Sequence, residues 1–377
     1  MNVEINRKAN FPTDIDAILD RVAKIDPVAY GSTRNYVDGA VSYLSPYISR
    51  GVISTKFIYF ELLKRRFPTG RILKFIQELA WRDYSQQVWI SKGDAINQDL
   101  KHTQEPVVTN GMSKAIRTSE TGIEVIDNAI QQFYKTGYLH NHIRMYIASI
   151  ACNIGHNHWK APAKWMYYHL LDADWASNAL SWQWVAGANS NKKYYANQEN
   201  INNFCYSDQR DTFLDISYDD FEGLAIPEIL IPSEEINLKT PLPEKTDLLI
   251  NSDHRTLIYN FYNLDPYWEK GRSANRILLL EPSHFEKYPV SQKTIDFTVE
   301  LSKNIDNIQI YVGEFSELNA YYNLGSIYYK EHPLNGHYQG TDVQRDWMFS
   351  IRGYFPSFFA YWKKCKKEII FTENKSV

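Results

Sequence analysis

Residues 172–191, DADWASNALSWQWVAGANSN, place polar and indole side chains at helical spacing. Asp174, Asn178 and Trp182 are four residues apart, so on a helix they form one stripe. Trp182 and Trp184 are two residues apart and therefore point about 200° away from each other. The plainest interpretation is a buried helix whose two tryptophans pack against different neighbours. The alternative is a stripe that faces a ligand, and the rest of the chain has to decide between them.

The composition limits the classes of function. The chain of 377 residues is long enough for two domains, each with its own core. Its net charge of −3 gives no overall attraction to nucleic acid, so nucleic-acid binding would need a local basic face. The widely spaced Cys152, Cys205 and Cys365 argue against a disulfide framework, a zinc site or an iron–sulfur cluster, and we expect no metal. No apolar leader and no run of about 18 apolar residues occurs, which predicts a soluble, cytoplasmic protein.

Residues 1 to about 222 have the periodicity of a mainly helical domain. We expect helices over 14–25, 54–67, 70–90 and 141–154, and another from about Pro162 to Leu171. Thr121 and Glu124 form a capping-box pattern, which predicts one more helix that Gly137 closes.

The pattern changes in the second half of the chain. Prolines mark residues 223–246, at Pro227, Pro232, Pro241 and Pro243. They predict an ordered crossing or linker rather than a helix. Beyond them, short apolar runs alternate with helical periods near 254–263 and 291–304. The runs lie at 247–250, 276–280, 308–312 and 326–329. The expected fold is therefore mainly α, followed by a small α/β domain with a parallel sheet over 247–377.

Four separated motifs occur in the first half of the chain. They are YGSTRNYVDGAVSYLSPYISRGVIS (30–54), ELAWRDY (78–84), TGYLHNHIRMYIAS (136–149) and DADWASNALSWQW (172–184). In this order and at this spacing they resemble the flavin-binding helical domain of the DNA photolyase and cryptochrome family. The resemblance covers roughly residues 28–206. It implies a non-covalently bound FAD and, as partner, DNA that contains pyrimidine dimers.

The resemblance also implies a set of cofactor contacts. Ser42, Leu44 and Ser45 would meet the phosphates of FAD, since anions favour a helix start, and ordinary helix capping is compatible with that role. Arg144 and Asp172 would form a buried ion pair beside the isoalloxazine ring, where it tunes the charge of the flavin more than it stabilises the fold. The other implied contacts are Tyr30, Arg82, Asn141, Asp174 and Asn178.

Position 178 and the tryptophans carry the implied redox chemistry. In this family the residue that faces flavin N5 is usually Asn in photolyases, Asp in plant cryptochromes and Cys in insect-type cryptochromes, so Asn178 favours repair over signalling. Trp182 would be the first electron donor to photoexcited flavin, and Trp159 the next. Residues 90–120, where the distal donor usually lies, contain no Trp or Tyr. Photoreduction is then either weak or ends at another surface donor, for which the candidates are Trp165, Trp89 and Tyr206.

The substrate pocket is implied on the opposite side of the same helix. A dimer inside a duplex must be flipped out to reach a buried flavin, and photolyases are one class of enzyme that does this. Trp81 and Trp184 would stack on the lesion, and Glu78 would hydrogen-bond the pyrimidine edge. Asn141 and Met145 occupy two positions that are histidines in (6-4) photolyases, so cyclobutane dimers are the favoured substrate. For Trp81 and Met145 the alternative is ordinary core packing.

Other features depart from the family or stay ambiguous. We expect the α/β antenna domain that usually precedes the flavin domain to be missing, and no second chromophore to bind. The segment KYYANQENINNFC (193–205) replaces the usual family sequence, which makes single-stranded DNA a candidate substrate. His140 and His142 are interpreted as structural or solvent-facing. A basic rim for DNA is predicted, with a solvated helix face as the alternative, at Lys56, Lys64, Arg65, Arg66, Arg71, Lys74, Lys192 and Lys193.

The preferred hypothesis is a deoxyribodipyrimidine photo-lyase, a monomer that splits cyclobutane pyrimidine dimers by electron transfer from excited reduced FAD. The main alternative is a blue-light photoreceptor of the cryptochrome kind without repair activity. The third is a flavin-free nucleic-acid-binding or scaffold protein. The pocket formed by Glu78, Trp81 and Trp184 argues against the second hypothesis, and the flavin contacts argue against the third.

Overall fold

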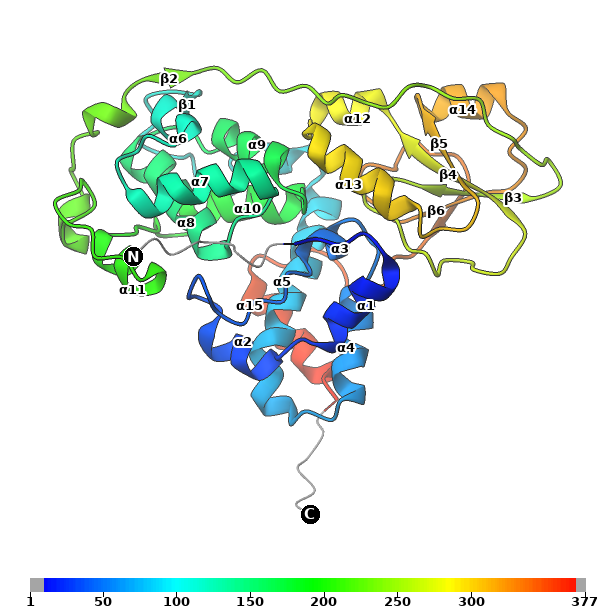
Figure 1. Cartoon of the computed structure of the whole chain (residues 1–377), viewed down its shortest axis with the longest axis horizontal. Coiled ribbons are helices and arrows are strands. Elements are labelled where there is room, and N and C mark those ends of the chain that lie inside the picture. Colours follow the sequence, from blue (N-terminus) through cyan, green and yellow to red (C-terminus); the bar gives the residue numbers. More distant parts are fainter. Residues whose placement is uncertain (1–9, 371–377) are drawn as a thin grey trace, which may run out of the picture. The chain divides into compact units, whose positions relative to one another are not determined.

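The computed structural model describes residues 10–370 (Figure 1). These residues form two compact units, each built from segments that are separate in the sequence. The first unit contains Ala29–Val41 and Lys92–Leu238. The second contains Phe11–Val28, Ser42–Ser91 and the described residues from Lys239 on. This grouping differs from the predicted division at 222 and 247, because two N-terminal segments pack with the C-terminal part of the chain.

The first unit is mainly helical, as predicted. Its central contacts join α10 (Trp175–Ala186) to α8 (Asn141–Ser149) and α9 (Lys160–His169). Ala176 and Ala179 of α10 are fully buried, and such small side chains let neighbouring helices approach closely. The other described helical elements of the unit are η1 (Gly93–Asn97), α6 (Lys114–Thr118), α7 (Glu124–Thr136), the π-helical η2 (Ile150–Ile154), α11 (Gln198–Cys205), η3 (Tyr218–Phe221) and η4 (Glu228–Leu230). Helix α2 (Pro27–Thr33) begins in the second unit and ends in the first.

The start of α7 corrects one sequence prediction. Thr121 does not cap this helix; its N-cap is Ile123, which makes no side-chain hydrogen bond. Instead the carboxylate of Asp127 accepts from Thr121 N and Oγ1, both at 2.8 Å, and from Gly122 N at 3.0 Å. Burial raises the pKa of Asp127. The predicted end is confirmed, since Gly137 follows the helix with a left-handed φ of 70°.

The proline-rich segment 223–246, most of which belongs to the first unit, contains no α-helix, as predicted. It holds η4 and β2 (Ser233–Glu234), which pairs antiparallel with β1 (Met112–Ser113). Lys114 N also donates to Pro232 O at 2.8 Å. These contacts fix the beginning of the crossing to the first unit.

The second unit contains the helices predicted near the N-terminus. Asp14 and Ser54 cap α1 (Ile15–Ala23) and α4 (Thr55–Lys64). The other described helical elements of this unit are α3 (Ser45–Ser49), α5 (Thr69–Lys92), α12 (Pro282–Lys287), α13 (Gln292–Ser302), α14 (Phe315–Tyr321), α15 (Phe358–Cys365) and η5 (Lys366–Glu368). Within residues 10–370 no helix is both long and apolar enough to cross a membrane. The predicted cytoplasmic location stays a prediction.

A parallel five-stranded sheet completes the second unit (Figure 1). Its order is β5-β4-β3-β6-β7, so β3 lies at the centre. The strands are β3 (Arg255–Tyr259), β4 (Ala274–Leu280), β5 (Ile308–Val312), β6 (Ile327–Lys330) and β7 (Thr341–Val343). Leu257 is paired with Arg276 on β4 and with Tyr328 on β6. Phe315 and Leu318 of α14 join the buried cluster that includes Ile258 and Ile277.

Two predictions within this sheet were wrong. The segment 254–263 is not helical, because its residues 255–259 form β3. The apolar run 247–250 is not a strand. The central strand of a parallel sheet is buried on both faces, so its sequence does not alternate and can be mistaken for a buried helix.

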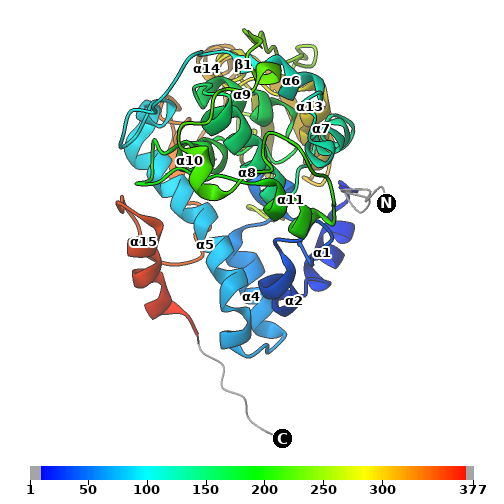
Figure 2. The same cartoon turned by 90° about the vertical axis from the view of Figure 1, so that its left-hand side faces the viewer.

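The segment 345–355 is hydrogen-bonded along α5 before α15 begins. Met348 N donates to Asp83 Oδ2 at 2.9 Å, and Gly353 N donates to Gln87 Oε1 at 2.9 Å. Tyr84 Oη donates to Phe355 O at 3.2 Å. Both orthogonal views show α15 beside α5 (Figures 1 and 2). The C-terminal helix is therefore an integral part of the second unit.

Candidate functional site

Helix α10 presents two chemically different faces. Asp174 and Asn178 are each 7% exposed and Trp182 is 2% exposed, whereas Trp184 is 43% exposed. The two tryptophans therefore point into different environments, as the helical spacing predicted. Asp174 is also the N-cap of the helix, since its carboxylate accepts from Ser177 N at 3.2 Å and from Ser177 Oγ at 3.1 Å. The buried stripe thus combines a carboxylate, an amide and an indole.

The amide of Asn178 has a fixed orientation. Its Nδ2 donates to Ala163 O on α9 at 2.8 Å. With the nitrogen engaged, the amide oxygen is the group that can accept a hydrogen bond from a ligand. A neutral amide can accept in this way without supplying a proton.

Arg144 and Asp172 form the predicted ion pair. Arg144 Nη1 lies 3.1 Å from Asp172 Oδ2, and the two side chains are 20% and 5% exposed. Arg144 Nε also donates to Leu139 O at 2.9 Å, which ties the guanidinium to the backbone just before α8. A pair held in this way places a fixed positive charge within a largely desolvated environment, where its effect on the charge of a bound ring is strongest.

The start of α8 brings the next predicted residues together. Asn141 Nδ2 lies 3.7 Å from Met145 Sδ, one helical turn away. Asn141 is exposed and Met145 is half-buried, so Met145 is not a fully buried core side chain. His140 is buried, and its Nδ1 accepts from His142 N at 3.3 Å. Burial lowers the pKa of His140 and of His142 to about 4, so both rings are neutral near pH 7. The two histidines are structural rather than solvent-facing.

Trp159 lies in an aromatic cluster that the sequence only partly indicated. Its Nε1 donates to Asp99 Oδ1 at 2.7 Å. The ring centroid of Trp175 is 6.4 Å away, with planes inclined by 33°. Both indoles are fully buried. Trp175 belongs to the fourth motif, but no role was predicted for it. It lies outside the stripe of Asp174, Asn178 and Trp182, and nothing in the sequence indicates that it contacts Trp159.

Two of the three candidate surface donors are wrong. Trp165 and Trp89 are each 1% exposed, so neither can exchange electrons directly with solvent reductants. Tyr206 is 52% exposed and stacks on Tyr36 with centroids 5.7 Å apart and planes inclined by 21°. Among the three, only Tyr206 has the exposure that a terminal donor requires.

The remaining residues that were predicted to contact the cofactor belong to two units. Tyr30 lies in the part of α2 that belongs to the first unit, and its carbonyl accepts from Arg34 N at 3.1 Å. Ser42, Leu44 and Ser45 belong to the second unit, where α3 begins at Ser45 as the resemblance implied.

Arg82 also belongs to the second unit. Its Nη1 donates to Ser49 Oγ at 3.2 Å and so links α5 to α3, the helix that follows the predicted phosphate loop.

Helix α5 carries the predicted substrate contacts of the second unit. Glu78 forms an ion pair with Lys74, with Oε1 and Nζ 2.7 Å apart. Trp81 is 36% exposed, so it is not a fully packed core aromatic. One face of its indole stacks on Phe358 of α15, with centroids 3.6 Å apart and planes inclined by 11°. Sequence patterns could not predict this contact, because the two residues are far apart in the chain.

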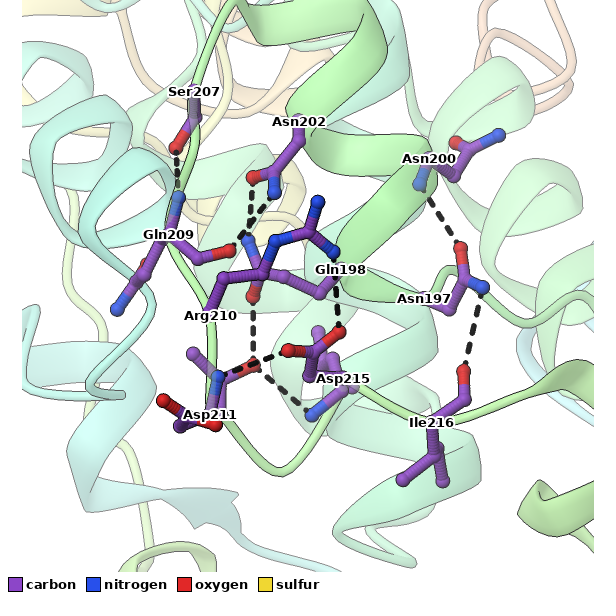
Figure 3. Close-up of polar contacts among 12 residues, drawn as sticks. Asn197, Gln198, Asn200, Asn202, Ser207, Gln209, Arg210, Asp211, Asp215 and Ile216 are labelled. Carbon is purple, nitrogen blue, oxygen red and sulfur yellow. Dashed lines mark hydrogen bonds and ion pairs between the residues drawn. The ribbon is translucent and has the colours of Figure 1, made fainter.

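The segment that departs from the family pattern forms α11 and its flanking turns (Figure 3). Asn197 caps the helix by accepting from Asn200 N at 3.0 Å. Gln198 Nε2 donates to Asn202 Oδ1 at 2.9 Å, and Asn202 Nδ2 donates to Gln209 O at 2.9 Å. Figure 3 shows Gln198 and Asn202 beside the turn that follows the helix, whereas Asn197 lies apart, next to Asn200 and Ile216. The amide-rich composition therefore serves a local network that fixes this turn.

A pocket of about 210 Å³ opens in the second unit at the carboxyl ends of β3, β4 and β6. The strand order reverses at β3, which is where parallel sheets commonly bind ligands. Glu281 accepts from Tyr338 Oη at 2.9 Å and from Phe315 N at 2.9 Å. Burial lowers the pKa of His284 to about 3 and that of His332 well below its usual value. The prediction that no second chromophore binds stays a prediction, and this pocket is the place to test it.

Comparison with known proteins relates part of this chain to a protein family. Residues 75–214 match the family described as the FAD binding domain of DNA photolyase. These residues belong to that family. The matched range includes most of α5, the Arg144–Asp172 pair and the α10 stripe. It contains three of the four motifs, at 78–84, 136–149 and 172–184, and the predicted relation to the FAD-binding domain of this family is confirmed.

Characterised proteins with related sequences are named photolyase or cryptochrome. A deoxyribodipyrimidine photo-lyase from Agrobacterium fabrum is 29% identical in an alignment over 185 residues, and the match covers 44% of this chain and 37% of that protein. One from Streptomyces griseus is 31% identical in an alignment over 173 residues, and the match covers 43% of this chain and 37% of that protein. A cryptochrome DASH from Synechocystis is 30% identical in an alignment over 173 residues, and the match covers 42% of this chain and 34% of that protein. The chain thus spans little more than a third of the length of these relatives.

Solved structures with similarity to the chain carry the same two names. A bacterial class III photolyase from Agrobacterium tumefaciens has a TM-score of 0.37 and 27% identity, and the match covers 45% of this chain and 37% of that one. A Synechocystis cryptochrome has a TM-score of 0.46 and 25% identity, and the match covers 50% of this chain and 42% of that one.

Proposed function

We propose that this protein is a light-driven DNA repair lyase that uses non-covalently bound FAD to split cyclobutane pyrimidine dimers. The observation that carries the proposal is the division of α10 into a buried stripe of Asp174, Asn178 and Trp182 and an exposed Trp184. Repair needs both parts, because the cofactor must be shielded from water while the lesion must enter from solvent. The names of the related proteins are consistent with this chemistry.

The residues of the first unit fit a flavin. Arg144, held by Asp172, offers a positive charge to an electron-rich ring, and the oriented oxygen of Asn178 offers an acceptor for a ring N–H. When bound, photoexcited reduced FAD would supply one electron to the dimer and recover it after the two cyclobutane bonds have broken, so that no net oxidation or reduction results. Trp182 and then Trp159 would deliver electrons when the cofactor has to be reduced. No side chain acts as a nucleophile, so the protein binds, orients and excludes water.

The proposed substrate contacts come from exposed aromatic and polar side chains. Trp184 and Trp81 would stack on the flipped dimer, since the face of an indole is a good platform for a base. Glu78 would accept hydrogen bonds from the pyrimidine edge, and Asn141 with Met145 would complete the pocket. Neutral Asn141 and Met145 supply no acid, which suits cleavage of a cyclobutane ring without a proton donor. We expect the protein to act as a monomer on DNA.

A blue-light photoreceptor is the second candidate, because one related protein is named cryptochrome DASH. The experiment that separates the two is light-dependent reversal of thymine dimers in defined single-stranded and double-stranded oligonucleotides. Repair in light and none in the dark supports the lyase. Normal flavin photoreduction without repair of either substrate contradicts it and favours the photoreceptor. The difference between the two oligonucleotides gives the strand preference.

A further inference from the structure

Helix α15 has an aromatic face that is buried and a second face that is exposed. Phe358, Trp362 and Cys365 are at most 5% exposed and pack into the second unit. Phe359 is 68% exposed, and Lys363 is exposed one helical turn later. The exposed face thus offers a large hydrophobic ring next to a flexible cation.

The buried face of α15 forms a stack that ends at Trp81. Phe358 lies between Trp81 and Trp362, with planes inclined by 11° to the first and 12° to the second. Phe359 stands beside the stack, since its ring centroid is 6.5 Å from that of Trp81 with planes inclined by 78°. Because Phe358 stacks on the indole, the 36% exposure of Trp81 lies outside that contact. Part of the Trp81 ring can therefore meet a ligand from solvent.

Cations follow these aromatic rings immediately. Exposed lysines occupy four of the five positions from 363 to 367: Lys363, Lys364, Lys366 and Lys367. Glu368, the acidic residue next in sequence, is engaged by Ser350, whose N donates to Glu368 Oε2 at 2.7 Å. The chain as a whole carries a net charge of −3, so this cluster is a local concentration of positive charge.

We infer that Trp81, Phe359 and the lysines of α15 and η5 form a binding platform for an unpaired DNA strand. Bases of the strand stack on Trp81 and Phe359, and its phosphates contact Lys363 and Lys367. Exposed aromatic rings interleaved with cations are the usual means of binding single strands without sequence preference. A duplex fits less well, because its bases are already stacked and paired. The inference rests on the proposed function in one respect, which is the assignment of Trp81 to the DNA side of the protein.

The test measures dark binding of a labelled oligothymidylate of about 12 nucleotides to the FAD-loaded full-length protein. Phe359→Ala should weaken binding roughly tenfold. Lys363→Gln combined with Lys367→Gln should reduce the slope of log affinity against log salt by about 1.4, since each single-strand phosphate contact contributes about 0.7. Both changes should have a smaller effect on a duplex of the same length. The matched controls are Tyr321→Ala and Lys303→Gln, which remove exposed side chains of α14 and of the residue after α13 and should change nothing.

Three results would overturn the inference. The wild-type protein could fail to bind the oligonucleotide, or all variants could show the same affinity and the same salt slope. Alternatively, the α15 variants could change their mass in sedimentation while their DNA binding stays the same. The last result would assign the face to a second copy of the chain. Phe359 and the lysines are exposed, and the lysine variants keep the test valid if Phe359→Ala is poorly folded. Light-driven repair is measured separately. If the α15 variants bind the oligonucleotide more weakly but the wild-type protein repairs no dimers, the proposed lyase is contradicted and the inference stands. If the wild-type protein repairs dimers but the α15 variants bind as tightly as wild type, the inference is contradicted and the proposed lyase stands.

Discussion

Replacing Trp184 by Ala separates a role in substrate binding from a role in the fold. Trp184 is 43% exposed, and its ring centroid is 5.7 Å from that of Tyr194 with planes inclined by 32°. This aromatic contact is worth about 0.5–1.5 kcal/mol, burial of the covered half of the indole adds about 1–2 kcal/mol, and the higher helix propensity of Ala offsets a few tenths. We therefore expect the free energy of unfolding to fall by about 1–3 kcal/mol, and the variant to stay folded. The flavin spectrum should not change, because Asn178 and Trp182 lie on the other side of α10.

Binding of the lesion by the folded variant should weaken. Stacking of one base on an aromatic ring contributes roughly 1–3 kcal/mol, so Trp184→Ala should raise Kd for a dimer-containing oligonucleotide about five- to 150-fold. The assay is fluorescence anisotropy in the dark at fixed salt, since phosphate contacts otherwise obscure the difference. Tyr218→Ala is the matched control, because Tyr218 is 51% exposed in the same unit and has no assigned role. Equal affinity of wild type and Trp184→Ala would refute the argument from the two faces of α10.

The remaining predictions concern the cofactor and the fold. Asp172→Ala should purify with much less flavin, measured by absorbance after gel filtration, because Arg144 loses the carboxylate that lies 3.1 Å from it; full flavin content would contradict the role of the pair. Trp182→Phe should keep flavin but slow its photoreduction sharply, and repair by chemically reduced protein should survive; photoreduction at the wild-type rate would mean that electrons take another route. His140 has a pKa of about 4 in the folded protein against 6.5 ordinarily, so the unfolded chain binds more protons between these values. The free energy of unfolding should therefore fall as pH decreases from 6.5 towards 4, and His140→Gln should reduce that slope in denaturant titrations at several pH values.

Local patterns predicted the helical part of the protein well. The spacing of Asp174, Asn178 and Trp182 was sufficient to place all three on one buried stripe. The resemblance to the photolyase family was sufficient to pair Arg144 with Asp172, although 28 residues separate them. Periodicity failed where burial is two-sided, as in β3, because nothing in a fully buried apolar run distinguishes a central strand from a helix.

Contacts between distant segments could not be read from the sequence. Phe358 stacks on Trp81 because α15 returns beside α5, and this return depends on hydrogen bonds such as that of Met348 with Asp83. The exposure of a tryptophan also depends on how the whole unit packs. Trp165 was therefore predicted as a surface donor from its sequence, but the fold buries it. The spacing of residues in the sequence shows on which face of its helix a side chain lies. It does not show which other segments of the chain cover that face.

Catalytic turnover under light is the most direct test of the proposed repair function. FAD-loaded protein with its flavin chemically reduced is mixed with an excess of an oligonucleotide that contains one thymine dimer, and the regained thymines are counted by chromatography in light and in the dark. A light-driven lyase should restore many dimers per protein molecule during illumination and none in the dark. Restoration that stops at or below one dimer per protein molecule, or that proceeds equally in the dark, would contradict the account.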